Sequence, residues 1–469
     1  MIIPMYFLAQ KQGNIWYFGD HAGLDFNSGN PITLNNGQTS YIGCPGCHSE
    51  GSSVIADSSG KLLFYCNGRK IWNKNHVLMQ NGDSLFSNPS STQGSLIVPL
   101  PGSSRYYYVF TTDAFFIDSL KYGFRYSVVD MCQNNGLGEV IRNKKNVFLL
   151  DTVSEKVTGV RHTNGIDYWI ITHKFRSDAF YAYLLTSAGI TNTVITHIGS
   201  KHTGVIGASI GQLKASPNGK KIALVNNTAS PSIAEYFDFD KTTGIVSNSV
   251  SIQTNTVWGY YGVSFSPDNS KLYISCSLNG NGIYQFDLNA GAGNPTSVIA
   301  SIKKIASGFN FLGLQLATNG KIYCARSPFI NNPYLSVINS PNTAGTNCNY
   351  ADTVIKLNGN SASYGLPNFI DSYDYSTTIN NCEVVGIEPN TIEREIGIYP
   401  NPFSNKLEFK LRHEEAYHLT LFDFSGKAVF KCQITGNEMI ETGVIESGWY
   451  YYKLQDTNGN TFTGKLVKE

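Results

Sequence analysis

The stretch that decides the fold is Tyr260–Ser275, with the sequence YYGVSFSPDNSKLYIS. It contains a glycine, a run with strand character, a polar turn and a second run with apolar residues at every other position. Alternation of this kind around a Pro-Asp-Asn turn is typical of a β-hairpin. Similar segments start at six glycines, spaced 43, 65, 52, 51 and 51 residues apart: Gly51, Gly94, Gly159, Gly211, Gly262 and Gly313. A repeat of about 50 residues is typical of the blades of a β-propeller.

Each unit is expected to hold four strands, because propeller blades are four-stranded sheets. The third strands are expected at 179–186, 234–240, 282–288 and 333–339. The fourth strands are expected at 192–198, 247–252, 297–302 and 353–357. The long second interval between glycines indicates an insertion around 113–125.

A seventh unit is divided between the two ends of the repeat region. Gly365 follows the last complete copy, in YGLPNFI, and only one strand pattern comes after it. Residues 14–31 supply the missing strands, since they align with 271–295 strand for strand. Pairing the two ends would close a ring and leave only short edges, which argues against a β-sandwich or an open solenoid. The sequence therefore predicts an all-β chain with a seven-bladed β-propeller over 11–371, closed by N- and C-terminal strands.

The composition argues against two classes of partner. The 469 residues include 35 basic and 34 acidic side chains, so the formal net charge is only +1. Nucleic acid and anionic membranes are bound through an excess of positive charge, and the excess in this chain is a single charge. No apolar run reaches 18 residues, so we expect no transmembrane helix.

The N-terminus has some features of a secretory signal peptide. Ile2–Ala9 is apolar and ends in a small residue, although no basic residue precedes it. We interpret 1–10 as the remnant of a truncated signal peptide, and a mildly hydrophobic tail is the alternative.

A different pattern begins after the repeats. Residues 372–394 are polar and turn-prone, which indicates a linker. Alternating strand patterns separated by tight turns follow over 395–469 and predict a small antiparallel, Ig-like β-sandwich. Four motifs stand out in this tail: YPNPF at 399–403, LFDFSGK at 421–427, SGWYY at 447–451 and GKLVK at 464–468.

These motifs resemble the type A C-terminal sorting domain of bacterial type IX secretion. The resemblance implies passage through the periplasm, recognition of the tail by the outer-membrane translocon, and a secreted or cell-surface protein. The alternative is an ordinary small sandwich that binds something else. The motif residues that carry the resemblance are Tyr399, Pro400, Asn401, Pro402, Gly426, Gly448, Tyr450, Gly464 and Lys465. The repeat region also resembles uncharacterised WD40/YVTN-like propellers with such tails, notably in YWIITH at 168–173, but that group supplies no activity to transfer.

One cysteine motif suggests a cofactor. Cys44-Pro-Gly-Cys47-His48 has the pattern by which c-type haem is attached, with the histidine as an axial ligand. The alternatives are a local disulfide or thiols paired elsewhere, and no second cysteine or histidine pair completes a zinc site. We expect no cofactor and no metal. The nine cysteines also allow disulfides in an exported protein, for instance between Cys348 and Cys382.

The four histidines at 162, 173, 197 and 202 lie in or near one unit. Because they fall on strands from the axis to the rim, we interpret them as ordinary hydrogen-bonded or exposed side chains and not as a metal or acid–base site.

We expect the working surface where loops lead into the inner strands around the central channel. Residues next to the repeated glycines would rim this surface, and ordinary packing near the axis is the alternative. The candidate ligand-binding residues are Glu50, Gln93, Thr158, Tyr261 and Tyr364.

No catalytic motif was found, and no catalytic residue is assigned. We therefore expect a non-enzymatic module that binds an extracellular protein or carbohydrate. A glycan lyase or hydrolase that uses the channel is the alternative, and a structural cell-surface component is the third interpretation. Acidic or basic groups converging in the channel would favour the enzyme, and an uncharged aromatic rim would favour the binding module.

Overall fold

The computed structural model describes residues 10–40, 49–115, 119–203, 206–228, 232–252, 259–277, 282–308, 310–326, 333–375, 397–411, 416–457 and 461–469. The chain divides into two compact units, Met1–Cys382 and Glu383–Glu469. Within the described ranges no helix is long and apolar enough to cross a membrane.

The described part of the first unit consists of seven antiparallel sheets that follow one another along the chain. Three sheets are β1 (Ile15–Phe18), β2 (Ala22–Asp25) and β3 (Ile32–Leu34); β4 (Ser53–Ala56), β5 (Leu62–Cys66) and β6 (Ile71–Asn73); and β7 (Ser95–Pro99), β8 (Tyr106–Thr111), β9 (Phe124–Asp130), β10 (Glu139–Val140) and β11 (Val147–Leu150). Two more are β12 (Val153–Arg161), β13 (Tyr168–Lys174), β14 (Ala179–Thr186) and β15 (Gly189–His197); and β16 (Leu213–Ala215), β17 (Lys221–Val225), β18 (Ala234–Phe239) and β19 (Val246–Ser251). The last two are β20 (Tyr260–Phe265), β21 (Lys271–Cys276), β22 (Gly282–Asp287) and β23 (Lys303–Ser307); and β24 (Phe311–Leu316), β25 (Ile322–Arg326), β26 (Tyr334–Ile338) and β27 (Tyr350–Lys356).

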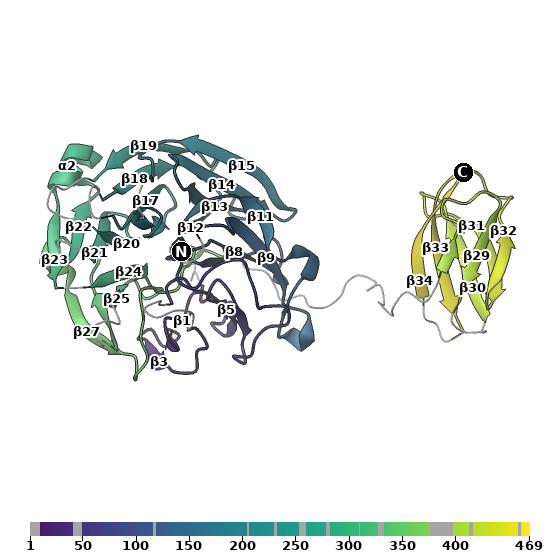
Figure 1. The fold of residues 1–469 in the computed structure, drawn as a ribbon, viewed down its shortest axis with the longest axis horizontal. Coiled ribbons are helices and arrows are strands. Elements are labelled where there is room, and N and C mark those ends of the chain that lie inside the picture. The colour runs from purple at the N-terminus through teal and green to yellow at the C-terminus, as the bar shows by residue number, and fades with distance from the viewer. Residues whose placement is uncertain are drawn as a thin grey trace, which may run out of the picture. The chain divides into compact units, whose positions relative to one another are not determined.

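The sheets are arranged around a common centre (Figure 1). The first strand of a sheet contacts the first strand of the next, as in the series β4, β7, β12, β16, β20 and β24. Later strands lie progressively farther out, because the sheets pair their strands in chain order; the exception is β11, which pairs with β9 and not with β10. This arrangement is that of a β-propeller, as the repeats predict.

The repeated glycines allow the inner strands to approach each other. A Cβ atom on Gly262 would lie 2.4 Å from the carbonyl oxygen of Leu312, at the start of the next inner strand. On Gly51 it would lie 1.9 Å from the backbone nitrogen of Gly94, and on Gly365 it would lie 2.0 Å from the carbonyl oxygen of Glu50. Any side chain at these positions would collide with backbone, so the repeat carries glycine there.

One expectation for the fourth strands is wrong. Residues 297–302 do not form a strand; helix α2 (Pro295–Ala300) occupies this segment, and β23 begins after it. The side chain of Asn294 accepts hydrogen bonds from the backbone nitrogens of Thr296 and Ser297, which caps the helix, and Pro295 is compatible with the first helical turn.

The ends of the repeat region meet, but not through a regular ladder. Residues 361–371 form isolated bridges, Ser361 with Asp20 and Pro367 with Ser52, and no assigned strand. Proline has no amide hydrogen to donate, so a continuous ladder through this segment is unfavourable. Packing adds to the contact, since the ring of Phe369 lies 6.0 Å from that of Trp16 on β1.

The second unit consists of two antiparallel sheets in its described part. One contains β28 (Gly397–Tyr399), β29 (Lys406–Lys410) and β32 (Glu438–Glu441), and the other β31 (Ala428–Thr435), β30 (Ala416–Phe422), β33 (Gly448–Asp456) and β34 (Thr461–Lys468). Both sheets contribute to one hydrophobic core, for example Phe409 from the first and Leu419 and Leu454 from the second.

Candidate functional site

Three of the five candidate rim residues gather at the end of the channel where the inner strands begin. The hydroxyl of Tyr261 donates to the carboxyl group of Glu50, and the Ser90 hydroxyl donates to Glu50 Oε1 at 2.9 Å. The ring of Tyr364 lies 6.0 Å from that of Tyr261. Glu50 and Tyr364 are partly exposed, whereas Tyr261 is buried.

A second carboxyl group lies beside them. Glu155, at the start of β12, accepts hydrogen bonds from the backbone nitrogen of Thr92 at 3.0 Å and from that of Phe115 at 2.9 Å. The neighbouring Lys156 donates to the carbonyl oxygens of Ser209 and Ile210 at 2.8 and 3.0 Å. We refer to Glu50, Ser90, Thr92, Glu155, Lys156 and Tyr261 together as the Glu50 cluster.

Burial controls the charge of this cluster. It raises the pKa of Glu50 to about 8, with a further contribution from the negative charge of Glu155. It also raises the pKa of Glu155, against the hydrogen bonds from Phe115 and Thr92. The pKa of Lys156 is lowered to about 7 because the ammonium group is desolvated, although Glu155 opposes this shift. Burial therefore favours the protonated form of Glu50.

The other two candidates, Gln93 and Thr158, lie inside the protein and not on the rim. Their exposed fractions are 1% and 0%. Gln93 links two sheets, since its Oε1 accepts from the backbone nitrogen of Leu213 at 2.7 Å and its Nε2 donates to the Leu213 carbonyl at 3.0 Å.

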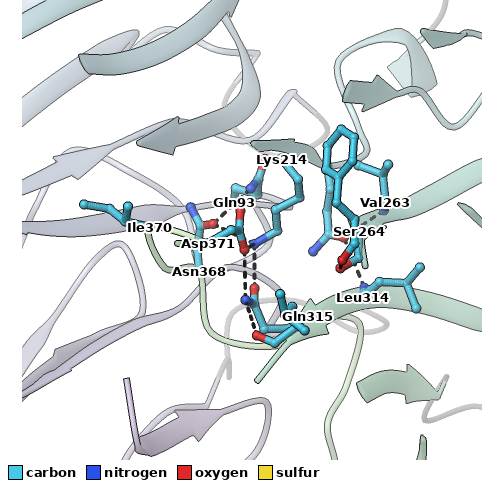
Figure 2. A network of polar contacts seen from close by, with 12 residues as sticks. Gln93, Lys214, Val263, Ser264, Leu314, Gln315, Asn368, Ile370 and Asp371 are labelled. Atoms are coloured by element: carbon cyan, nitrogen blue, oxygen red, sulfur yellow. Dashed lines mark hydrogen bonds and ion pairs between the residues drawn. The ribbon is translucent and has the colours of Figure 1, made fainter. Parts of the chain in front are cut away.

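Polar side chains from several inner strands and from 368–371 form a hydrogen-bonded network (Figure 2). Lys214 Nζ lies 2.5 Å from Gln315 Oε1, 3.1 Å from Asn368 Oδ1 and 3.4 Å from Asp371 Oδ1. Gln315 Nε2 donates to the same Asp371 oxygen at 3.0 Å, and Gln93 Nε2 donates to Asn368 at 3.1 Å. We name these five residues the central network.

The central network joins strands that have no ladder between them. Asn368 donates to the carbonyl oxygens of Ser95 and Val157, on β7 and β12. Gln212 acts similarly, because its Oε1 accepts from the backbone nitrogens of Val263 and Leu314, each at 3.1 Å. The middle of the channel is thus occupied by the protein's own hydrogen-bonded side chains.

The histidines are less dispersed than expected. The rings of His173 and His202 stack with centroids 4.1 Å apart, and their exposed fractions are 1% and 0%. Both nitrogens of His202 lack a hydrogen-bond partner among the described residues. Burial lowers the pKa of His173 to about 3 and that of His202 well below its usual value. His162 and His197 lie elsewhere, against Trp169 and Asp178.

Sequence reasoning did not identify Glu155 and Lys156. The available signal was the pair of charged residues in 153–158, VSEKVT, immediately before Gly159. A charged side chain on an inner strand is buried, and a buried charge is stable only when it is paired with an opposite charge or hydrogen-bonded.

The cofactor motif lies outside the described residues, as do 1–10 except Gln10. Cys132 is disulfide-bonded. The expectation for Cys348 is wrong, because it is a free, buried thiol packed in the core with Ile338. No group of three or more His, Cys, Asp or Glu side chains within the described ranges is arranged to hold a metal ion.

The sorting motif residues hold the second unit together. Asn401 Nδ2 donates to the Lys465 carbonyl at 3.0 Å, and Asn401 Oδ1 accepts from the Val467 backbone nitrogen at 2.9 Å, which fixes the YPNPF segment along β34. Tyr450 is buried and donates to the Glu446 carbonyl at 2.6 Å. A Cβ atom on Gly464 would lie 2.4 Å from the ring of Tyr452.

Gly426 closes the LFDFSGK turn with a φ of +83°, a conformation that glycine adopts without strain. The Lys465 ammonium lies 5.7 Å from the centre of the Tyr451 ring. Tyr399 ends β28, Pro400 and Pro402 flank Asn401, and Gly448 begins β33. Of the motif residues, Asn401, Gly426, Tyr450 and Gly464 therefore have structural roles in this unit.

Solved structures with similarity to the chain are distant in sequence. The nidogen/laminin complex is 12% identical, with 65% of this chain and 96% of that chain covered at a TM-score of 0.38. The periplasmic gluconolactonase PpgL of Pseudomonas aeruginosa is 12% identical, with 80% and 95% covered at 0.37. The Dos1 propeller is 11% identical, with 66% and 73% covered at 0.37. At these TM-scores the similarities carry no argument about activity.

No curated protein sequence matches the chain. Residues 397–469 match the family described as Secretion system C-terminal sorting domain, which covers the described part of the second unit. The chain is therefore a β-propeller protein that carries a type IX secretion sorting domain and is exported to the cell surface or the extracellular space.

Proposed function

We propose that the seven sheets are the blades of a closed seven-bladed propeller and that the second unit is an Ig-like sandwich. The bridges of 361–371 to Asp20 and Ser52 support closure of the ring. The common core of the two C-terminal sheets supports the sandwich.

The propeller acts as a non-enzymatic module that binds an extracellular protein or carbohydrate through the Glu50 cluster and Tyr364. The observation that carries this proposal is the hydrogen bond from Tyr261 to a Glu50 whose pKa is raised to about 8. It leaves a partly exposed, uncharged acid beside two aromatic rings, a combination suited to ligand hydroxyl and amide groups. The hydrogen-bonded side chains in the middle of the channel would prevent a ligand bound at this end from passing through.

A surface enzyme is the second candidate. It is favoured by the proximity of two carboxyl groups, Glu50 and Glu155, and an amine, Lys156, all with perturbed pKa values. A protonated Glu50 would serve as a general acid towards a glycosidic oxygen.

One set of variants separates the two candidates. The native secreted protein is screened on a glycan and peptide array, and each ligand is also incubated with the protein and analysed by mass spectrometry for cleavage. Glu50→Gln imitates the protonated acid, so a binding module retains its ligand within about threefold, whereas an enzyme loses turnover.

Tyr364→Ala should weaken binding about tenfold or more, since partly buried tyrosines are frequent binding hot spots. Tyr181→Ala is the matched control, because Tyr181 is a partly exposed tyrosine on the third strand of its sheet. Cleavage of a ligand that depends on Glu50 would replace the binding proposal with the enzymatic one. Equal effects of the two tyrosine variants would exclude this end of the channel as the site.

A further inference from the structure

Two exposed phenylalanine side chains contact the same arginine on the surface of the propeller. The exposed fractions are 39% for Phe86, in the loop before β7, and 55% for Phe148, on β11. The guanidinium carbon of Arg125, on β9, lies 5.1 Å from the centre of the Phe86 ring and 5.2 Å from that of Phe148. The ring of Tyr122 stacks on Phe86 with centroids 4.9 Å apart. We refer to Phe86, Tyr122, Arg125 and Phe148 together as the Phe86 patch.

Hydrogen bonds hold the backbone of this patch in place. Asn146 Oδ1 accepts from the backbone nitrogen of Phe86 at 2.9 Å, and Asn146 Nδ2 donates to the Ser84 carbonyl at 3.1 Å. Arg125 Nε donates to the Tyr122 carbonyl at 2.6 Å, and its Nη1 donates to the Asn146 carbonyl at 2.9 Å. The exposed rings are therefore positioned before a partner arrives, which reduces the conformational entropy that binding would cost.

The patch belongs to the repeat unit that is longer than the others. The interval from Gly94 to Gly159 is 65 residues, and no other interval between the six repeated glycines exceeds 52. The sheet of this unit has five strands in its described part, whereas the other propeller sheets have three or four. Arg125 and Phe148 are directly paired across the additional ladder, between β9 and β11. Insertions in one unit of a repeat protein often supply its binding surface.

Positive charge is concentrated around the patch. The segments that form it are 83–86, 121–125 and 142–148, and they contain five basic side chains and one acidic side chain, although the formal net charge of the whole chain is only +1. These six residues are Lys121, Arg125, Arg142, Lys144, Lys145 and Asp83. Lys145 pairs with Asp83 at 3.6 Å, whereas Arg142 and Lys144 are exposed just before β11. A partner with complementary charge therefore carries carboxylates beside its apolar contact.

The composition of the patch favours a protein over a polysaccharide. Aromatic residues and arginine are enriched in protein–protein interfaces, and a polar rim surrounds the interface core, as Arg142 and Lys144 border this patch. Phenylalanine has no polar group, and the Nε and Nη1 atoms of Arg125 already donate to carbonyl oxygens of the chain. The centre of the patch thus offers few hydrogen-bonding groups to sugar hydroxyls.

We propose that the Phe86 patch binds an acidic segment of an extracellular protein. An apolar side chain of that segment packs on Phe86 and Phe148, and its carboxylates pair with Arg142 and Lys144. The patch shares no residue with the Glu50 cluster, and its test uses different probes and variants, so it stands or falls independently of the function proposed for that cluster.

Fluorescence anisotropy with labelled peptides tests this proposal on the native full chain. The probes are peptides with a central leucine, methionine, phenylalanine or tryptophan flanked by glutamates. One set of control peptides replaces the glutamates with lysines, and another replaces the central residue with serine. At least one acidic probe should bind with a Kd below about 1 mM and about tenfold more tightly than both of its controls. Its affinity should fall when the salt concentration is raised from about 50 to about 500 mM, because the charges are exposed.

Two pairs of variants locate the bound probe. Phe148→Ser should weaken binding about tenfold, since exposed aromatic anchors are frequent hot spots, whereas Ile195→Ser, at a side chain 50% exposed on β15, should not. Lys144→Glu should weaken binding about fivefold or more, whereas Lys220→Glu, at an exposed lysine of another sheet, should not. Thermal melting verifies that each variant is folded.

Three results would overturn the proposal. One is the absence of binding by every acidic probe at a protein concentration of about 1 mM. Another is an equal effect of the two variants in either pair, or equal affinity for the lysine-flanked control peptides. The third is an oligogalacturonate that binds more tightly than every acidic peptide and is lost in Phe148→Ser, which would replace the protein partner with an acidic glycan.

Discussion

The buried ion pair of the central network allows a quantitative prediction. The exposed fractions of the Lys214 and Asp371 side chains are 2% and 5%, and their charged atoms lie 3.4 Å apart. Burial lowers the pKa of Lys214 and raises that of Asp371, while each partner opposes the shift of the other. Lys214→Met leaves a desolvated carboxylate without its cation, and such a change costs about 3–5 kcal/mol.

A second lysine supplies the matched control. Lys221, on the adjacent strand β17, pairs with Asp238 at 2.6 Å, but the exposed fractions of these side chains are 34% and 41%. Exposed pairs contribute about 0–1 kcal/mol, so Lys221→Met should have little effect on stability. The double variant Lys214→Met/Asp371→Asn removes both charges, so it should be more stable than Lys214→Met alone.

Urea unfolding followed by tryptophan fluorescence measures these differences. Trp16 and Trp169 are 0% and 1% exposed and report the propeller, whereas Trp449 of the second unit is already 66% exposed. The free energy of unfolding should fall much further for Lys214→Met than for Lys221→Met. If the losses of unfolding free energy in Lys214→Met and Lys221→Met agree within about 1 kcal/mol, the Lys214–Asp371 pair does not stabilise the contact between the sheets at the centre.

Further predictions concern charge, buried histidine, export and the cysteine motif. Because the pKa of Glu50 is raised from 4.5 to about 8, the folded state retains a proton that the unfolded chain releases, so the stability contribution of this group falls as pH rises from about 4.5 to 8. Urea titrations at pH 5 and 8 should show that the free energy of unfolding falls less between these pH values for Glu50→Gln than for the unchanged protein. An equal fall for both proteins would contradict the raised pKa of Glu50. His202→Phe should be neutral or stabilising in the same assay, since it replaces two buried nitrogens that have no hydrogen-bond partner among the described residues with an apolar ring; a loss of stability above about 2 kcal/mol would contradict this expectation. Removal of 397–469 should retain the propeller in the periplasm, as cell fractionation would show, and export of the truncated chain would contradict the role of the tail. The native protein should be colourless, whereas a Soret band and a mass increased by one haem would assign a redox centre to Cys44, Cys47 and His48.

The hairpins could be predicted because their signals are local. The stretch 260–275 forms β20 and β21 with the turn at 267–269, and the glycine at 262 has its predicted role beside the next inner strand. Asn294-Pro295 is also a local signal, for the start of a helix, whereas the repeat predicts a strand over 297–302.

The site could be predicted only in part, because its contacts are distant in sequence. Glu50 and Tyr261 are 211 residues apart, and His173 and His202 stack although they belong to different segments. The repeat indicated which residues lie near the axis, but not which are buried. Gln93 therefore seemed to be a rim residue, whereas its amide is fully used in linking Leu213 and Asn368.

The most direct test of the central claim is to locate the bound ligand by hydrogen–deuterium exchange, using the ligand selected on the array. Slower exchange is expected in peptides that contain Glu50, Tyr261 and Tyr364, at the end of the channel where the inner strands begin. Protection confined to the second unit or to the outer strands, with no change in those three peptides, would contradict it.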